Sequence, residues 1–236
     1  DWLNAHDRKR TQWRELTPTS PFYLFIPRHT AFAERYSGYP SLTTVFALKG
    51  VGMTTARDEF VIDFDKRQLL NRIRLFKNSR LSDEDLHRYF QIRKKKGWSI
   101  RRAWQQLQIF SDSELESRVA PVLYRPFDTR VIFYDDSLVW RTVKQVMRHM
   151  LAGENLALLV SRQTAGEFRH AFVTDLVSNF NNIDIAGRFG SGYHFPLYLY
   201  PTADREDIFA HHEPSERKPN LNPAIVAALA AAYGQE

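Results

Sequence analysis

Two polar segments carry side chains whose hydrogen-bonding groups match the edges of nucleic-acid bases. In the first, Gly50 and Gly52 permit a tight turn that presents two threonines and an arginine, with Asp58 placed to orient that arginine. The second, residues 161–170, leaves the end of a predicted strand and is rich in Arg, Gln, Thr and His. Arg and Gln form paired hydrogen bonds with guanine and adenine edges. We therefore expect base contacts from Thr54, Thr55, Arg57, Arg162, Gln163 and Arg169.

Both segments also have a purely structural interpretation. Arg57 and Asp58 would then form a surface ion pair in a hairpin turn, and residues 161–170 would be a solvated loop. A dinucleotide site is excluded at the first segment, because Thr55 stands where the third glycine is required and a strand is predicted to follow. A pyrophosphate site needs a helix N-terminus at that point.

Motifs for catalysis or metal binding are missing from the sequence. The eight histidines include no HExxH motif and no pair at helical i, i+4 spacing, and there is no cysteine. No GxSxG motif or P-loop is present, and no ExK motif follows the carboxylates of Asp63 and Asp65. The loops that an aminomethyltransferase requires are also absent. We expect a chain that is not itself an enzyme and that holds no metal or cofactor.

Positive charge is concentrated in one part of the chain. Lys and Arg number 33 against 27 acidic residues, a net charge of +6. Residues 66–102 contain thirteen of these cations and three acids, which is typical of a surface that binds phosphates, although a solvated helix face is the alternative. We expect phosphate contacts from Lys49, Lys94, Lys95, Lys96, Arg101, Arg102, Lys144 and Arg148.

The composition is that of a globular domain with a substantial core. Of the 236 residues, 43% are hydrophobic and 25% are charged. The lack of cysteine suits a reducing cytoplasm, and no apolar run is long enough to cross a membrane. The chain begins at Asp1 without a signal-like pattern, so we interpret it as a fragment of a larger multidomain protein.

The elements that must position these residues follow from periodicity and capping signals. Aromatic and β-branched runs alternate with helical segments in no regular βαβ order, which predicts an α+β fold with a mixed β-sheet core and a basic helical insertion. Strands are predicted at 22–27, 43–48, 59–64, 129–134, 156–161, 171–174 and 195–200. Helices are predicted around 69–77, 82–92, 99–107, 113–122, 141–151 and 223–233.

Several runs of residues, in this order, resemble a known family. They are GVGMTTARDEFVIDF (50–64), LYRPFDTRVIFYD (123–135), LALLVSRQTAGEFRHAFVTD (156–175), HFPLYLYP (194–201) and KPNLNPAIVAALAAAYG (218–234). From about residue 20 onward the chain resembles the C-terminal specificity domain of Type ISP restriction-modification enzymes. Tyr124–Phe127 and the run FPLYLY are the most specific parts. The resemblance implies that a nuclease, an ATP-driven translocase and an N6-adenine methyltransferase precede this domain, and that S-adenosylmethionine, ATP and magnesium bind to them.

On this basis we expect a domain that recognises a specific double-stranded DNA sequence and that partners the methyltransferase and motor domains of the same chain. Residues 1–20 would be a linker from the methyltransferase, 21–213 the target-recognition domain, and 214–236 a linker and a helix leading to a further segment. Two alternatives stay open: a docking module that couples methyltransferase and motor without reading DNA, and a degenerate nuclease.

Overall fold

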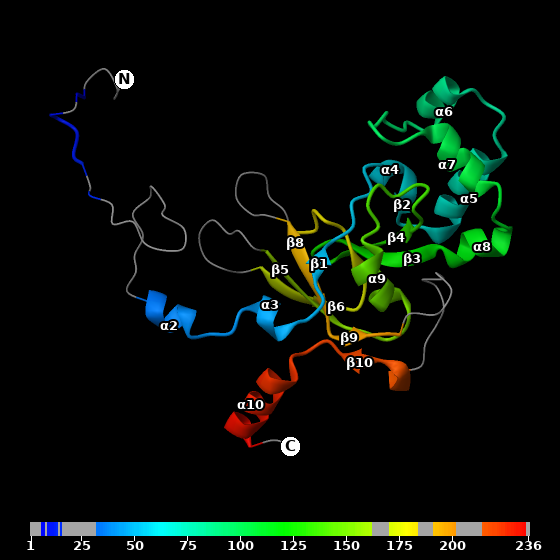
Figure 1. Ribbon diagram of the computed structural model, residues 1–236. Helices are drawn as coiled ribbons and strands as arrows, with labels where there is room; N and C mark the ends of the chain where they lie inside the picture. The colour runs from blue at the N-terminus through cyan, green and yellow to red at the C-terminus, as the bar shows by residue number, and fades with distance from the viewer. Residues whose placement is uncertain are drawn as a thin grey trace. The chain divides into compact units, whose positions relative to one another are not determined.

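The computed structural model describes residues 6–7, 9–13, 15, 32–161, 170–183, 191–201 and 214–234. Contacts within the chain divide it into two units, Asp1–Ser41 and Leu42–Glu236. The described part of the first unit contains helix α2 (Ala33–Ser37), and the strand predicted at 22–27 lies outside the described residues. The second unit contains the other helices and strands that the structure describes (Figure 1).

Two four-stranded sheets form the framework of the second unit. The first is antiparallel, in the order β1 (Gly50–Val51), β8 (Gly192–Pro196), β5 (Ala157–Ser161), β6 (Ala171–Thr174). The second has the order β2 (Ile62–Asp63), β4 (Asp128–Phe133), β3 (Val119–Arg125), β7 (Val177–Ser178), and its β3–β7 pair is parallel. A short antiparallel ribbon pairs β9 (Tyr198–Leu199) with β10 (Lys218–Pro219).

Helices are inserted between strands β2 and β3 of the second sheet. They are α5 (Lys66–Asn78), α6 (Asp83–Tyr89), α7 (Ile100–Leu107) and α8 (Asp112–Ser117), which lie together beside that sheet in Figure 1. The remaining helices of the unit are α3 (Leu42–Val45), α4 (Asp58–Val61), α9 (Lys144–Leu151), the 3-10 turn Pro214–Glu216 and α10 (Pro223–Tyr233). The α+β class, the mixed sheet and the helical insertion are therefore confirmed.

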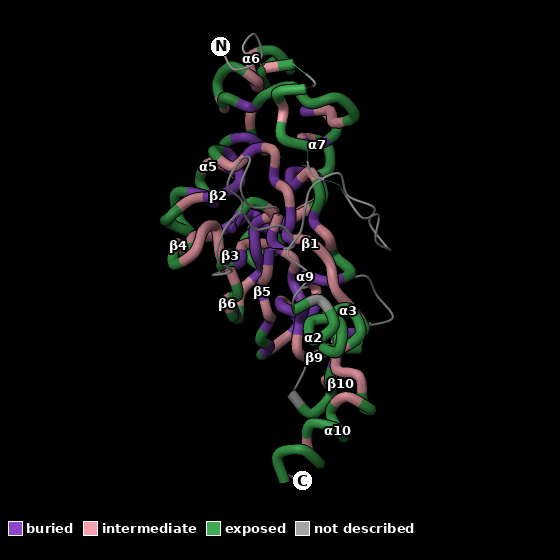
Figure 2. Tube along the Cα trace, turned by 90° about the vertical axis from the view of Figure 1, so that its left-hand side faces the viewer, coloured by how far each residue is buried: buried purple, intermediate pink, exposed green. Residues whose placement is uncertain are grey.

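Capping residues begin the inserted helices where the sequence predicts. Ser82 accepts a hydrogen bond from the backbone N–H of Asp85, and Ser99 accepts one from Arg102. In α5 the residues Leu69, Leu70, Ile73 and Phe76 face inward and join a core that extends to the second sheet, drawn as buried in Figure 2. Burial of this apolar face holds the insertion against the sheet.

Three predicted elements are wrong. The strand expected at 43–48 is a helical turn, α3, followed by Phe46, whose ring packs on Phe195. Half of the strand expected at 59–64 is helix α4, which buries the consecutive residues Phe60 and Val61, and only Ile62–Asp63 pair with β4. The helix expected at 113–122 ends at Ser117, and Pro121 lies in strand β3. Pro121 pairs with β4 on one side, and on its other side β7 pairs with β3 only from Val122 onward.

The two ends of the second unit are joined by one buried asparagine. Asn220 donates hydrogen bonds to the carbonyls of Leu48 and Pro196, both at 2.7 Å, and accepts one from the N–H of Leu48 at 2.8 Å. Beside it, the N–H of Asn222 donates to the carbonyl of Val45 at 2.8 Å. We call these contacts the asparagine clasp. They fix the chain after β10 against the chain before β1.

Candidate nucleic-acid interface

The segment after Gly52 is held tightly against the rest of the domain. Backbone hydrogen bonds link Thr54 to Arg141 in both directions, each at 2.9 Å, and the N–H of Trp140 donates to Thr55. Thr54 is half-buried, whereas Thr55 is only 1% exposed and its hydroxyl donates to Asp58. Of the two threonines, only Thr54 is placed with part of its surface open to a ligand.

Arg57 is an interior residue, which contradicts the expectation that it reads a base. Its side chain is 5% exposed, its guanidinium carbon lies 3.6 Å from the centroid of the Trp98 ring, and Nη1 donates to the carbonyl of Leu138 at 2.5 Å. Burial lowers the pKa of Arg57 to about 10, so the group is still a cation at neutral pH. Asp58 does not orient it, because that carboxylate accepts hydrogen bonds from Thr55 and Tyr124.

The second polar segment begins and ends on paired strands. Ser161 ends β5, and its N–H donates to the carbonyl of His170, which directly precedes β6. Arg162, Gln163 and Arg169 lie outside the described residues. Their connection to a rigid strand pair is as predicted, and their assignment to base contacts stays a prediction.

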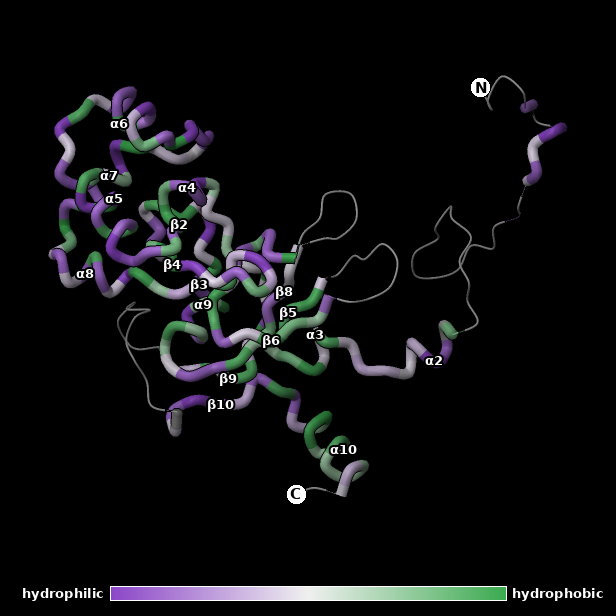
Figure 3. The backbone as a smooth tube through the Cα atoms, turned by 180° about the vertical axis from the view of Figure 1, so that it is seen from behind, coloured by the Kyte–Doolittle hydropathy of each residue, from purple (hydrophilic) through white to green (hydrophobic). Residues whose placement is uncertain are grey.

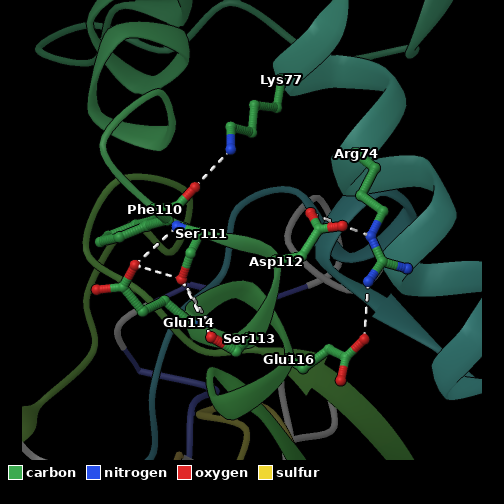
Figure 4. Close-up of polar contacts among 8 residues, drawn as sticks. All are labelled: Arg74, Lys77, Phe110, Ser111, Asp112, Ser113, Glu114 and Glu116. Atoms are coloured by element: carbon green, nitrogen blue, oxygen red, sulfur yellow. Dashed lines mark hydrogen bonds and ion pairs between the residues drawn. The ribbon is translucent and has the colours of Figure 1, made fainter.

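Two arginines of the helical insertion are neutralised by acids that lie outside the window 66–102. Arg72 pairs with Asp63, and Arg74 pairs with Asp112 and, at 2.7 Å, with Glu116 (Figure 4). Lys77 in the same view donates to the carbonyl of Phe110. These cations fasten α5 to α8 and to the sheet, so a charge count along the sequence overstates what the helix faces offer a ligand.

Four of the other cations are consecutive in the loop between α6 and α7. Arg93, Lys94, Lys95 and Lys96 are all exposed, and we call residues 93–96 the basic loop. The structure records no ion pair or hydrogen bond for these four side chains among the described residues, and the Nζ of Lys95 lies 5.6 Å above the Trp140 ring. A cavity of 390 Å³ borders Lys94–Lys96 together with Trp98 and the start of α7. Free cations on an anchored loop are suited to phosphate.

The other predicted phosphate contacts divide into free and occupied side chains. Arg102 is exposed and lines a second cavity, of 370 Å³, which also borders Trp98 and Asp136. Lys144 pairs with Asp136 at 2.5 Å, and Arg101 pairs with Asp83 at 2.6 Å. The structure therefore brings Arg102 and Lys144 close to the basic loop around Trp98.

Two predicted phosphate contacts, Lys49 and Arg148, lie apart in the sequence from the basic loop and are half-buried. Arg148 donates at 3.4 Å to the carbonyl of Pro201, so one of its donors is already engaged. Lys49 precedes strand β1.

The described residues show no group of three or more His, Asp and Glu side chains arranged to hold a metal ion. His194 is fully buried with its Nδ1 2.9 Å from the hydroxyl of Ser178, and burial lowers its pKa to about 3. It is therefore neutral at physiological pH. Among the described helices, none has the length and apolar character needed to cross a membrane.

Comparison with known proteins places this geometry in a family. The family model for the Type ISP C-terminal specificity domain matches residues 44–236. The chain belongs to this family. Its members are domains of restriction-modification enzymes, and in this specificity domain the match spans both sheets and the helical insertion. No curated protein matches the chain.

Solved structures share the fold of this specificity domain. One is the DrdV–DNA complex, with a TM-score of 0.63 and 18% sequence identity; the match covers 99% of this chain and 23% of that chain. Another is the Type ISP enzyme LlaBIII bound to DNA, with a TM-score of 0.61 and 19% identity; the match covers 90% of this chain and 14% of that chain. A third is a nuclease-deletion mutant of the Type ISP enzyme LlaGI with a DNA substrate mimic, with a TM-score of 0.56 and 16% identity; the match covers 91% of this chain and 20% of that chain. The chain thus spans less than a quarter of the length of these proteins.

The hairpin between β3 and β4 holds candidate residues that the sequence analysis did not select. Arg125 and Phe127 stand at its turn, within the run Tyr124–Phe127 on which the family resemblance was based. The sequence Pro126–Phe127 could have identified this turn, since the position after a turn proline usually favours glycine or asparagine and a bulky residue there is unusual. Arg93 and Arg141, both exposed, were also missed.

Proposed function

We propose that this specificity domain recognises a specific double-stranded DNA sequence on behalf of a single-chain restriction-modification enzyme. In that enzyme an N6-adenine methyltransferase would modify the site, and an ATP-dependent translocase and a nuclease would act on unmodified DNA. The observation that carries the proposal is the basic loop, whose four cations have no acidic partner among the described residues, in a member of the Type ISP family.

The division of labour follows from the chemistry of the two regions. The basic loop, with Arg102 and Lys144 nearby, would hold phosphates and fix the register of the duplex. Base edges would be read by Thr54 and by the segment that contains Arg162, Gln163 and Arg169. Catalytic groups, S-adenosylmethionine, ATP and magnesium would belong to the other domains, so this chain alone would neither methylate nor cleave DNA.

Binding to duplexes with a randomised central sequence tests the proposal. We expect the chain to bind the pool at low salt, to lose affinity steeply as salt rises, and to enrich one sequence motif over repeated rounds of selection. Absence of binding at 50 mM salt would contradict DNA recognition. Binding without an enriched motif would reduce the role to holding DNA.

A docking function is the second candidate, and helix α10 is the observation that favours it. None of its eleven residues is buried, and its sequence PAIVAALAAAY has no charged side chain. It is drawn as exposed in Figure 2 and as largely hydrophobic in Figure 3. A docking module would bind the methyltransferase or motor domain and would show no salt-dependent affinity for random duplex, so the same titration separates the two functions.

A further inference from the structure

The turn of the β3–β4 hairpin has an unfavourable backbone conformation. Arg125 pairs with Asp128, which leaves Pro126 and Phe127 as the two central residues, and Phe127 has φ +64°. A proline followed by a residue of positive φ is the pattern of a type II turn, whose second central position favours glycine or asparagine. A phenylalanine adopts that region only at an energetic cost.

Burial of the phenylalanine does not offset this cost. The side chain of Phe127 is 94% exposed, and its ring meets Phe172 only edge-on, with 6.3 Å between the ring centroids. Strained residues persist where the surrounding structure determines their conformation, and they cluster at active sites and ligand-binding sites.

The hairpin beneath the tip is held by a stack of alternating rings and guanidinium groups. The guanidinium of Arg130 lies 4.2 Å from the Phe64 ring centroid and 4.1 Å from that of Tyr124, and Arg125 lies 4.1 Å from Tyr124. The Tyr124 hydroxyl donates to Asp58 at 2.8 Å. The tip therefore stands on a rigid base, which a contact of defined geometry requires.

Charge at the tip favours a polyanion. Arg130 is neutralised by Asp128 at 2.8 Å, whereas Arg125 forms no ion pair among the described residues, and the structure gives its guanidinium one hydrogen bond, to the carbonyl of Tyr124. The tip thus offers one aromatic face and one uncompensated cation. The ring that Phe127 meets, Phe172, belongs to β6, the strand that follows the predicted base-reading segment in the sequence.

We infer that the β3–β4 tip is a DNA-contacting element in which Phe127 packs against a base of the target and Arg125 binds a neighbouring phosphate. The inference rests on the proposed function, and it adds Phe127 as a residue that contacts DNA through an apolar surface. Two apolar surfaces of DNA fit the ring: the face of a base exposed by a partly unstacked step, and the methyl group of thymine.

The experiment compares F127G, F127A and the control Y233A, which removes an exposed ring from α10, on the motif that the unchanged chain enriches. We expect F127G and F127A to lose affinity equally, by about fivefold to a hundredfold, the range for loss of a stacked aromatic. We also expect F127G to unfold at the same temperature as the unchanged chain or higher, because glycine removes the strain. Y233A should bind normally.

Each outcome decides the inference. Full affinity and selectivity in both Phe127 variants would overturn it in favour of a protein contact at the tip, while the proposed function would stand. Loss in only one of the two variants would show that the missing ring is not the cause, because both variants lack it, and would also overturn the inference. If the unchanged chain enriches no motif, the proposed function fails and the inference fails with it. Deoxyuridine in place of thymidine should reduce affinity if the methyl group is the contact, and permanganate-reactive thymines should be observed if a step is unstacked.

Discussion

The basic loop and the β3–β4 tip are both exposed, yet they offer DNA opposite kinds of contact. The loop carries four cations and no apolar side chain at residues 93–96, whereas the tip carries one uncompensated cation and one ring that is 94% exposed. Phosphates are the same at every base pair, while base faces and methyl groups are not. Under the proposed function, the loop would therefore hold DNA and the tip would read it.

Reversal of three loop charges should give the largest effect. We expect K94E/K95E/K96E to weaken binding to every duplex on the order of a thousandfold at 0.15 M salt, because three phosphate contacts are lost and three carboxylates then repel the backbone. Affinity measured on cognate and random duplexes checks this. The control K66E/R67E/R80E makes the same charge change on exposed parts of the insertion and should cost tenfold at most. Equal losses in the two variants would show that only the net charge matters, and the contrast between the regions would disappear.

Acid should destabilise the domain through a buried histidine of α9, which sets the pH range for any binding comparison. His149 is buried, its Nδ1 accepts a hydrogen bond from the N–H of Tyr200 at 3.0 Å, and burial together with the charge of Arg148 lowers its pKa to about 4. Since the unfolded chain takes up the proton near pH 6.5, the stability present above that pH is lost as the pH falls toward 4, by about 3 kcal/mol. Urea unfolding at several pH values measures it. The variant H149Q should flatten the profile, and an unchanged slope would contradict the assignment.

Removal of the buried guanidinium should affect stability and leave sequence preference alone. We expect R57M to lower the free energy of unfolding by about 2 kcal/mol, since the carbonyl of Leu138 loses its donor and Trp98 loses its cation. The exposed control R102M should change it by less than about 0.5 kcal/mol. Both are measured by urea unfolding. If R57M instead changes the enriched motif at full stability, Arg57 reads a base after all.

The smallest effect on DNA affinity is expected from a substitution that gives the β3–β4 tip a second free cation and so makes its charge more like that of the basic loop. In D128N the guanidinium of Arg130 loses its neutralising partner, so the tip gains a free cation. We expect affinity for random duplex to rise about fivefold and the slope of log affinity against log salt to steepen by about 0.9, as for one added phosphate contact. A salt titration measures both quantities. An unchanged slope would place the tip away from the DNA backbone.

Local signals in the sequence predicted the helical insertion well, and long-range contacts explain what they missed. The caps Ser82 and Ser99 and the apolar spacing of α5 act within one or two turns, so they can be identified without the fold. The fate of Arg57 is decided by Trp98 and by Leu138, which is 81 residues away, and no local pattern records either. The excess charge was similarly overestimated, because Asp63, Asp112 and Glu116, which pair with Arg72 and Arg74, lie outside the counted window 66–102.

The asparagine clasp gives the second unit the character of an exchangeable cassette. The chain that enters this unit and the chain that leaves it are hydrogen-bonded to each other through Asn220 and Asn222. Asn220 follows its partner Leu48 by 172 residues in the sequence. The chain before residue 46 and the chain after residue 221 therefore connect to this unit at one joint, the asparagine clasp. A graft between related specificity domains needs to match only that joint, so under the proposed function an exchange of residues 46–221 should transfer the DNA preference. The hydrogen bonds that join Asn220 to Leu48 and Asn222 to Thr44 connect residues 172 and 178 positions apart, so they close very long loops, whose closure entropy opposes their formation.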